Sequence, residues 1–464
     1  MIIPLIIAVA MFMETLDSTI VSIAIPTIAG AFGINPVDLK LALTSYLITL
    51  AIFIPISGYV ADRFGSKKTF CLAISVFSFG SLLCALSINL HMLILCRVVQ
   101  GIGGALMLPV GRLILLRTYP KAEFARVMSI VIVPALLGPA LGPTAGGLLL
   151  HYATWHAIFW INVPVGILGL LAALYYFPKD AAERQTKAMD IKGFILFGAG
   201  LSSLTFAMAV LGEAFAHYDW AIVWFVISLI MLGGYYFHYR CCMHPVLDLA
   251  LFKNRIFSIS MVVGFFSRCT SGAVIFLLPL LLQLIWHDTP LESGFMFFPY
   301  ALGMMSAKLL FVRYWLKRYG FRRVLWWNCI ALALSIFCLA QWSTPGSHIG
   351  FGFFLFIQGL LVSQQFTALG PLTYLNIDEV KYSQATSIAS THLQFSVGAG
   401  IAFAAILLHF LANYFNLPLF SEKVFYTAII VLGIIMLLAL PFIRGISKEF
   451  LLPSAENTTG ARKH

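Results

Sequence analysis

Two carboxylic acids lie three residues apart in the first apolar segment of the chain. Glu14 and Asp17 would project from one face of a helix, about 4.5 Å apart along its axis. An ionised carboxylate is costly at the depth of a membrane, so its neutral form becomes accessible near physiological pH. Two acids at this spacing should bind and release protons jointly. The chemistry that they favour is reversible protonation, and the alternative is a structural ion pair whose protonation never changes.

Basic and amide side chains in other apolar segments could complete such a site. Arg97 does not readily lose its proton, so we expect it to stabilise a nearby carboxylate and not to carry the proton. A structural arginine that is bound to backbone carbonyls is the alternative. Bases inside a membrane usually face a cavity or a partner. We therefore predict a substrate cavity lined by Arg112, Arg268, Lys308, Gln100, Gln358 and Gln365.

The bases inside the apolar segments outnumber the acids there, which favours an anionic or zwitterionic cargo. In the alternative interpretation, Arg112 neutralises Glu14 while Arg268 and Lys308 extend to the membrane interface.

No catalytic signature accompanies these groups. The chain contains no HExxH or GxSxG pattern and no paired acids in a catalytic motif. The cysteines stand singly in apolar segments or, as Cys241 and Cys242, in a loop without a CxxC partner, which favours core filling over metal binding or disulfides. We predict no enzymatic activity, no cofactor and no metal.

The composition indicates that these residues lie on membrane-spanning helices. Apolar residues make up 61% of the 464-residue chain, 10% of residues are charged, and the mean hydropathy is +0.95. Soluble domains are about one quarter charged. The longest polar interruption, around residues 178–192, is shorter than the ~50 residues that a soluble domain needs. We expect an all-α integral membrane protein whose apolar start is a retained first span and not a signal peptide.

Apolar runs between polar or Gly/Pro breaks predict fourteen spans. They lie near residues 2–30, 40–61, 70–88, 91–116, 124–149, 155–177, 190–211, 219–237, 256–285, 293–314, 324–342, 349–374, 385–412 and 424–444. Basic residues concentrate in alternate loops, whereas the loops of the other side hold Lys40 and Lys423. The positive-inside rule places the basic side and both termini in the cytoplasm. The net charge of +11 then reflects orientation in the membrane and not nucleic-acid binding.

An internal repeat divides the chain. The loop YVADRFGSKK (residues 59–68) aligns without gaps with YWLKRYGFRR (residues 314–323). This offset predicts an N-terminal six-helix bundle (1–177), a segment with cytoplasmic linkers and two additional helices (178–255), and a C-terminal six-helix bundle with a short cytoplasmic tail (256–464). Parallel halves of this kind are typical of alternating-access transporters, which bind substrate near the membrane midplane.

Two further motifs combine glycine with charge or proline. In the repeated loop, Gly65 permits a tight turn, Gly58 permits close helix approach, and Asp62 with neighbouring bases can form charge pairs across the interface between the halves. We predict a cytoplasmic gate formed by Gly58, Asp62, Arg63, Gly65, Lys67, Lys68, Arg318 and Gly320. In the fifth span, glycines at every fourth position form a packing stripe, and prolines permit a bend, at Gly138, Pro139, Gly142, Pro143, Gly146 and Gly147.

These motifs resemble those of the major facilitator superfamily, and in particular its fourteen-span drug:proton antiporters of the EmrB/QacA type and their MdtD-like branch. Four places carry the resemblance: LDSTIVSIAIP (16–26), GYVADRFGSKK (58–68), RVVQGIGG (97–104) and GPALGPTAGG (138–147). Ser22 replaces the asparagine usual in the family. At the sixth span, His156 and Ala157 stand where Arg and Trp are common, while the pattern continues with Phe159, Asn162, Pro164 and Gly166.

The resemblance implies a role in proton transfer for the Arg97 motif, a gate latch at Asp62 in the outward-open state, and export as the direction of transport. The resulting hypothesis is a proton-coupled antiporter that exports small molecules or drugs across the cytoplasmic (inner) membrane, with an organic anion or metal chelate as cargo. Its partners are the small-molecule substrate, protons and membrane lipid, and the proton gradient supplies the energy. A periplasmic adaptor is left undecided. The alternatives are an uncoupled facilitator and a non-transporting receptor or scaffold on the same fold.

Overall fold

A computed structural model describes residues 2–119, 127, 131, 138, 141–178, 189–211, 218–242, 245–307, 312–342, 348–374, 377 and 381–446 of the chain. Within these ranges the regular secondary structure is entirely helical. Twelve helices among the described residues are long and apolar enough to cross a membrane. Two more predicted spans, 124–149 and 293–314, fall partly outside these ranges, and their described parts are helical over 141–152 and in α13 (Pro290–Ser306).

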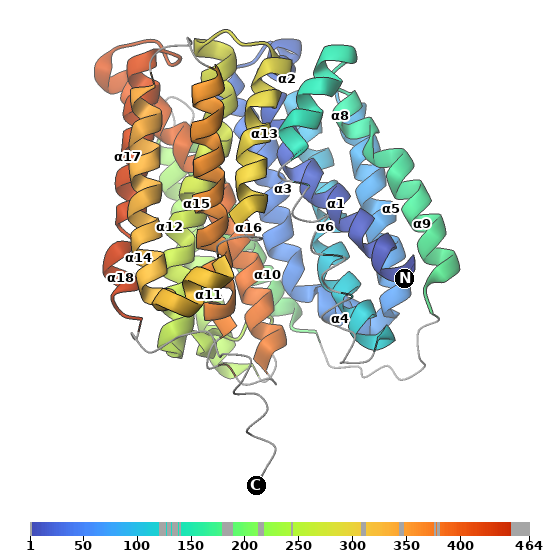
Figure 1. Cartoon of the computed structure of the whole chain (residues 1–464). Coiled ribbons are helices and arrows are strands. Elements are labelled where there is room, and N and C mark those ends of the chain that lie inside the picture. The colour runs from blue at the N-terminus through green and yellow to red at the C-terminus, as the bar shows by residue number, and fades with distance from the viewer. Residues whose placement is uncertain are drawn as a thin grey trace.

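The helices follow one another as the apolar segments predict (Figure 1). The first half contains α1 (Ile2–Ile23), α2 (Ile25–Phe32), α3 (Lys40–Phe53), α4 (Ser57–Phe64), α5 (Ser66–Ala85), α6 (Leu90–Thr118), α8 (Ala157–Trp160) and α9 (Asn162–Tyr176). A hairpin follows, formed by α10 (Ile191–Leu211) and α11 (Tyr218–Cys241). The second half contains α12 (Arg255–Leu280), α13, α14 (Val312–Gln341), α15 (His348–Tyr374), α16 (Tyr382–Phe415), α17 (Glu422–Leu437) and α18 (Leu440–Ile443).

Local sequence sets several helix ends. At the start of α13, the Thr289 hydroxyl accepts a hydrogen bond from the backbone N–H of Glu292, and the Glu292 carboxylate accepts one from the backbone N–H of Thr289. This reciprocal cap satisfies donors that have no partner within the helix. Gly33 ends α2 and Asn416 ends α16 in the left-handed conformation that commonly closes a helix.

The sequence repeat is also a structural repeat. Gly65, between α4 and α5, has φ +95°, and Gly320, at a kink within α14, has φ +75°. Side chains rarely adopt such a backbone conformation, so each turn requires glycine. The two residues before each glycine also adopt the same arrangement. The Arg63 guanidinium lies 5.9 Å from the Phe64 ring centroid, and the Arg318 guanidinium lies 5.7 Å from the Tyr319 ring centroid.

The two additional helices cover the seam between the halves. α10 packs against α3 of the first half and α16 of the second as well as against α11. Ile48 and Ile52 of α3 cluster there with Leu201 of α10. α11 carries large apolar side chains that are exposed in the protein alone, such as Trp220 and Ile230, and these are suited to contact lipid.

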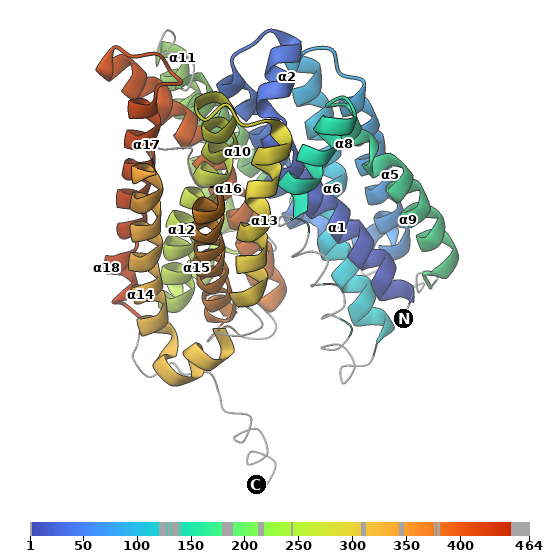
Figure 2. The same ribbon diagram turned by 45° about the horizontal axis from the view of Figure 1, so that its top comes forward.

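The halves contact each other at the end where α1 leads into α2. Gln283, which follows α12, donates a hydrogen bond to the backbone oxygen of Ile23 at 2.9 Å. The Thr144 hydroxyl donates to the backbone oxygen of Gly294 in α13, also at 2.9 Å. Figure 2 shows the halves meeting near α2 and the helices of the first half leaning away from α13 toward the lower edge. The conformation is therefore closed at the α2 end.

Candidate functional site

Asp17 is enclosed by polar side chains from neighbouring helices. Its side chain has no exposed surface, and its Oδ2 accepts a hydrogen bond from Arg97 Nη1 of α6 at 2.5 Å. Its Oδ1 accepts from Gln100 Nε2 at 2.9 Å and from Asn162 Nδ2 of α9 at 2.8 Å. The structure thus brings Asp17, Arg97 and Gln100 together, but Gln100 belongs to this enclosed network and not to an open substrate cavity.

Arg97 makes further contacts that fix its guanidinium. Nη1 also donates to Gln100 Oε1 at 2.8 Å, Nε donates to the backbone oxygen of Ala42 at 3.4 Å, and the guanidinium carbon lies 4.1 Å from the Tyr46 ring centroid. The ion pair with Asp17 is charge-assisted and much shorter than the bond to the Ala42 carbonyl. The structural alternative of an arginine bound to carbonyls therefore describes only a minor part of its environment.

Asn162 is a member of this network that was not among the predicted site residues. Besides Asp17, its Nδ2 donates to Ser81 Oγ at 3.1 Å, and Ser81 donates to the backbone oxygen of Phe159 at 2.9 Å. These bonds tie α9 and α8 to α5 and α1. The sequence feature that could have identified Asn162 is the family-like pattern of the sixth span, in which this polar residue stands at the start of an apolar helix.

Glu14 has different surroundings, although it lies one turn before Asp17. The residue is 6% exposed. A Cβ placed on Gly104 would lie 3.1 Å from the Tyr46 hydroxyl and 3.5 Å from Glu14 Cγ, so both side chains pack beside this glycine. Among the described residues, the ion pairs of α6 are Arg97 with Asp17 and Arg117 with Asp62. The alternative in which Arg112 neutralises Glu14 is therefore not observed.

The glycine stripe of the fifth span packs directly on α1. A Cβ on Gly138 would lie 2.1 Å from Thr15 Oγ1, one on Gly142 would lie 2.2 Å from Thr19 Oγ1, and one on Gly146 would lie 2.5 Å from Ile23 Cγ2. These three contacts step along α1 every four residues, on both sides of Asp17. Gly147 instead faces the second half, since its Cβ would lie 2.6 Å from the Pro290 backbone oxygen. Pro143 also contacts α13, since its backbone oxygen lies 2.8 Å from a Cβ placed on Gly294. Pro139 lies outside the described residues.

Arg268 is buried inside the second half. Its Nη1 lies 3.0 Å from Nδ1 of His392 in α16. A guanidinium can only donate, so Nδ1 accepts and the His392 ring is neutral in this arrangement. Arg268 does not extend to the membrane interface, contrary to the alternative interpretation. Arg112 of α6 is partly buried, and no ion pair joins it to an acid within the described part of the chain.

The remaining predicted cavity residues are dispersed. Gln358 lines a cavity of about 10 Å³ together with Ser267 and Thr270, which is room for one water molecule. Gln365 Oε1 accepts a hydrogen bond from Asn328 Nδ2 at 2.8 Å and so joins α14 and α15. Within the described part of the chain, neither amide is hydrogen-bonded to Arg112 or Arg268. Lys308 lies outside the described residues.

The charged residues of the predicted gate pair within the first half. Asp62 Oδ1 lies 2.8 Å from Arg117 Nη2, and both side chains are about half exposed. The predicted charge pair between the two halves is not observed. The halves lean apart at this end, and the base that lies near Asp62 is Arg117 of α6, in the same half. Lys67 donates to the backbone oxygens of Leu174 and Phe177 at 2.7 and 2.8 Å. These carbonyls lie at the C-terminal end of α9, where a cation is favoured.

The other gate residues lie at the surface or form the turns. Arg63 donates to the Tyr59 hydroxyl at 2.9 Å, and Lys68 and Arg318 are exposed. Apart from its own helix and chain neighbours, no atom of the described residues lies within 4 Å of a Cβ placed on Gly58. The expected close helix approach at Gly58 is therefore absent in this conformation, whereas Gly65 and Gly320 make the predicted turns.

The cysteines only partly fill the core. Five are buried as expected: Cys71, Cys84, Cys96, Cys269 and Cys329. Cys241 and Cys338 are exposed, and Cys242 is half-buried. Core filling is thus wrong for Cys241 and Cys338, because both stand on helix faces that no other described helix covers.

Comparison with known proteins agrees with the motifs. The sequence profile described as Major Facilitator Superfamily matches residues 7–239 and 260–459. Proteins named multidrug resistance protein MdtD, from Yersinia pestis and Yersinia pseudotuberculosis, are 36% identical over 446 residues, which covers 95% of this chain and 94% of each relative.

Solved transporter structures share the fold at low sequence identity. A mutant of the nucleoside transporter NupG is 13% identical with a TM-score of 0.66, covering 96% of this chain and all of that one. The xylose transporter XylE from E. coli, in a partially occluded inward-open conformation, is 12% identical with a TM-score of 0.60, covering 98% of this chain and 99% of that one. The profile and the MdtD relatives span nearly the whole chain, so this multi-pass membrane protein belongs to the major facilitator superfamily and is a transporter, not an enzyme.

Proposed function

We propose that the chain is a proton-coupled antiporter that exports small molecules across the cytoplasmic membrane by alternating access. The relatives named as multidrug resistance proteins support drug-like cargo. The distribution of basic loops supports cytoplasmic positions for both termini. The two buried acids of α1, Asp17 inside its network and Glu14 one turn away, support coupling to protons, and they are the observation that carries the proposal.

The two acids of α1 take different parts in this coupling. Asp17 is bound by Arg97, Gln100 and Asn162, so its charge is compensated and its carboxylate serves to hold the helices of the first half together. Glu14 packs beside Gly104 and the Tyr46 hydroxyl, without an arginine partner among the described residues. A carboxylate without such compensation is costly when buried. Glu14 is therefore the acid that takes up and releases the transported proton.

The packing of α1 connects this site to the interface between the halves. The fifth span contacts α1 through Gly142 and Gly146 and contacts α13 through Gly147. A shift of α1 on protonation of Glu14 would move this span against the second half. Close contacts at the α2 end, such as that of Gly147 with the Pro290 backbone oxygen, would then be broken and remade as the halves alternate.

The cargo is an anion, either an organic anion or a negatively charged metal chelate. Arg112 of the first half and Arg268 of the second each have a buried guanidinium Nε without a hydrogen-bond partner among the described residues. His392 lies against Arg268 in its neutral form and leaves the charge of that arginine uncompensated. Two such bases from opposite halves would attract an anion when the halves enclose it.

Transport by purified protein in proteoliposomes tests the coupling. With an imposed proton gradient, wild type should accumulate members of a panel of cationic dyes, organic anions and metal chelates. Glu14→Gln and Asp17→Asn should abolish this accumulation, whereas Asp219→Asn, which changes an exposed acid of α11, should retain it. Accumulation that persists in both α1 variants would contradict the role of these acids. Counterflow without any effect of the gradient would indicate a facilitator, and absence of counterflow would indicate a receptor or scaffold.

Charge reversal tests the cargo class. Arg112→Glu and Arg268→Glu should each shift selectivity from anions toward cations by at least about tenfold, since reversal replaces an attraction by a repulsion. Arg323→Glu, at an exposed position of α14, should leave selectivity unchanged. Unchanged selectivity in all three variants would remove the proposal of an anionic cargo.

A further inference from the structure

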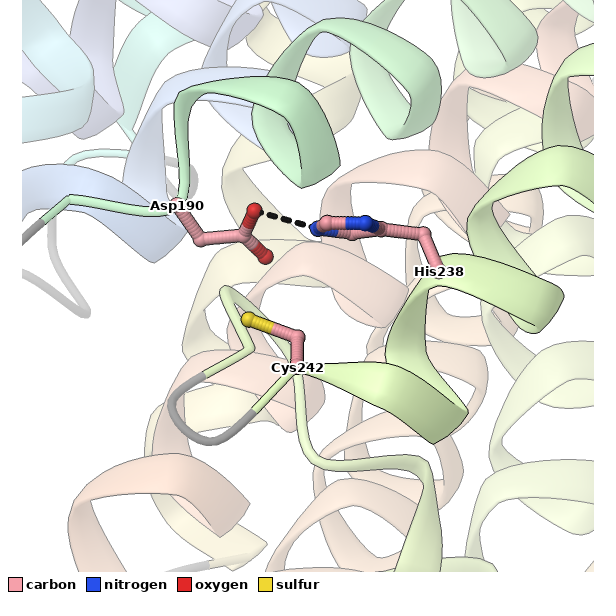
Figure 3. A group of neighbouring side chains, drawn as sticks. All are labelled: Asp190, His238 and Cys242. Carbon is pink, nitrogen blue, oxygen red and sulfur yellow. Dashed lines mark hydrogen bonds and ion pairs between the residues drawn. The ribbon is translucent and has the colours of Figure 1, made fainter.

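Three potential metal ligands meet at one end of the α10–α11 hairpin. Asp190 precedes α10, His238 lies in the last turn of α11, and Cys242 follows that helix. Their carboxylate oxygen, ring nitrogen and sulfur lie within 4.8 Å of one another, and Figure 3 shows the three groups facing a common space. Asp190 and His238 are 48 residues apart in the sequence, so the packing of α10 on α11 creates this group.

We propose that Asp190, His238 and Cys242 form a binding site for a divalent transition metal ion, with Zn²⁺ as its ligand. Carboxylate, imidazole and thiolate are the ligand types that Zn²⁺ combines in proteins, whereas Mg²⁺ and Ca²⁺ prefer oxygen ligands alone. His238 and Cys242 are four residues apart, which places both on one side of the helix end. The site lies outside the transport network and does not rest on the proposed function.

The geometry requires only small movements to accept the ion. Without metal, His238 Nε2 and Asp190 Oδ1 share a proton at 2.6 Å. A tetrahedral ion with bonds of about 2.0–2.3 Å separates its ligand atoms by about 3.3–3.7 Å. The ion therefore replaces the shared proton and moves the oxygen and nitrogen apart by about 1 Å, while the sulfur approaches. The shared proton and the thiol proton pass to solvent.

Neighbouring groups hold the ligands in place. Asp190 Oδ1 accepts from the backbone N–H of Gly193 at 2.8 Å, and Oδ2 accepts from that of Val246 at 3.3 Å. Burial acts to raise the pKa of Asp190, but the hydrogen bonds from Gly193, His238 and Val246 hold that pKa below its ordinary value. The two backbone donors fix the orientation of the carboxylate toward His238. Supporting hydrogen bonds of this kind are typical of metal sites.

A simpler interpretation explains only part of the cluster. Asp190 caps α10 and pairs with His238, and both interactions would occur without metal. This interpretation gives no role to the thiol of Cys242, which makes no hydrogen bond within the described part of the chain. A metal ion accounts for all three groups. It would connect the start of α10 to the end of α11 and so close the hairpin that covers the seam between the halves.

Zinc binding to the purified, full-length protein tests the proposal. After treatment with a chelator, wild type should bind one Zn²⁺ per chain in competition with a chromogenic chelator, and an excess of Mg²⁺ or Ca²⁺ should not displace it. Cys242→Ser and His238→Gln should each lower the affinity by at least about 10- to 100-fold, the loss typical for removing even an indirect partner of a metal. Cys241→Ser is the matched control, because this adjacent cysteine is exposed and outside the cluster.

A second measurement distinguishes metal binding from unfolding of a variant. Co²⁺ in place of Zn²⁺ should give a thiolate charge-transfer absorption band in wild type and Cys241→Ser, and this band should be absent in Cys242→Ser. Zn²⁺ should raise the thermal unfolding midpoint of the first two proteins and not that of Cys242→Ser. The proposal is overturned if wild type binds no Zn²⁺, or if Cys242→Ser binds Zn²⁺ as tightly as wild type does.

Discussion

At the scale of single residues, Asp17 and Glu14 look alike in the sequence but differ in their hydrogen-bond and ion-pair partners. Asp17 has three side-chain donors and no exposed surface, whereas Glu14, one turn away, packs beside a tyrosine hydroxyl and a glycine. Burial of a charge is tolerated only where partners compensate it. Breaking the network around Asp17 should therefore lower both the stability of the protein and its transport activity. The two losses can be measured separately.

Removal of Arg97 should destabilise the protein more than removal of the whole ion pair. Arg97→Gln leaves the Asp17 carboxylate buried without its partner, which should lower the free energy of unfolding by about 3–5 kcal/mol. In Asp17→Asn/Arg97→Gln, no unpaired charge remains, so much of this loss should be recovered. Thermal unfolding midpoints of the four proteins in detergent form the double-mutant cycle. A double variant that is destabilised by the sum of both single changes would contradict the coupling.

Asn162 should affect the function of Asp17 although it carries no charge. Asn162→Ala removes one donor from Asp17 Oδ1 and one from Ser81, and a hydrogen bond to a charged group contributes about 1.5–3 kcal/mol. We expect a lower unfolding midpoint and slower gradient-driven transport, because the packing of α1 against α9 is weakened. Asn413→Ala, at an exposed position of α16, is the matched control. If Asn162→Ala unfolds and transports as wild type does, Asn162 does not support the network around Asp17.

At the scale of helices, small residues decide how closely the fifth span approaches its neighbours. The atoms nearest to a Cβ on Gly142 or Gly146 belong to side chains of α1, with α1 backbone atoms at 3.0–3.2 Å, whereas the atom nearest to a Cβ on Gly147 is the Pro290 backbone oxygen at 2.6 Å, which cannot rotate away. A methyl group at Gly147 should therefore act on the interface between the halves. The same change at Gly142 should be accommodated more easily.

Gly147→Ala should favour conformations that are open at the α2 end. Its Cβ would lie 2.6 Å from the Pro290 backbone oxygen, so α13 must move away. Ser293→Cys provides a reporter, because Ser293 is fully buried in α13. A membrane-impermeant maleimide should label this cysteine several times faster in the Gly147→Ala background. Gly233→Ala, where no described residue outside its own helix lies within 4 Å of the new methyl group, should not change the rate. Equal labelling in all backgrounds would contradict the role of Gly147.

At the scale of the whole molecule, the two halves share a turn that depends on glycine. Gly65→Ala and Gly320→Ala should each lower the free energy of unfolding by about 1–3 kcal/mol, because alanine is strained at these positive φ values. Gly58→Ala, in a helix with free space around it, should cost nothing or stabilise the protein. Thermal unfolding in detergent measures all three changes. Tolerance of alanine at both turn positions would show that the repeat does not need this conformation.

From the sequence alone followed the helical membrane fold, the spans that the structure describes, the paired glycine turns and the presence of a carboxylate near Arg97. Span length and apolar content are local properties, and a buried base must find an acid, so few arrangements were available. The tertiary structure alone decided that Asn162 joins Asp17, that Asp62 pairs within its own half, and that Asp190, His238 and Cys242 meet. These contacts join residues that are far apart in the chain. Several side chains of the same chemical type could have served as partners, and only the packing of the helices and the conformation of the halves determine which ones meet.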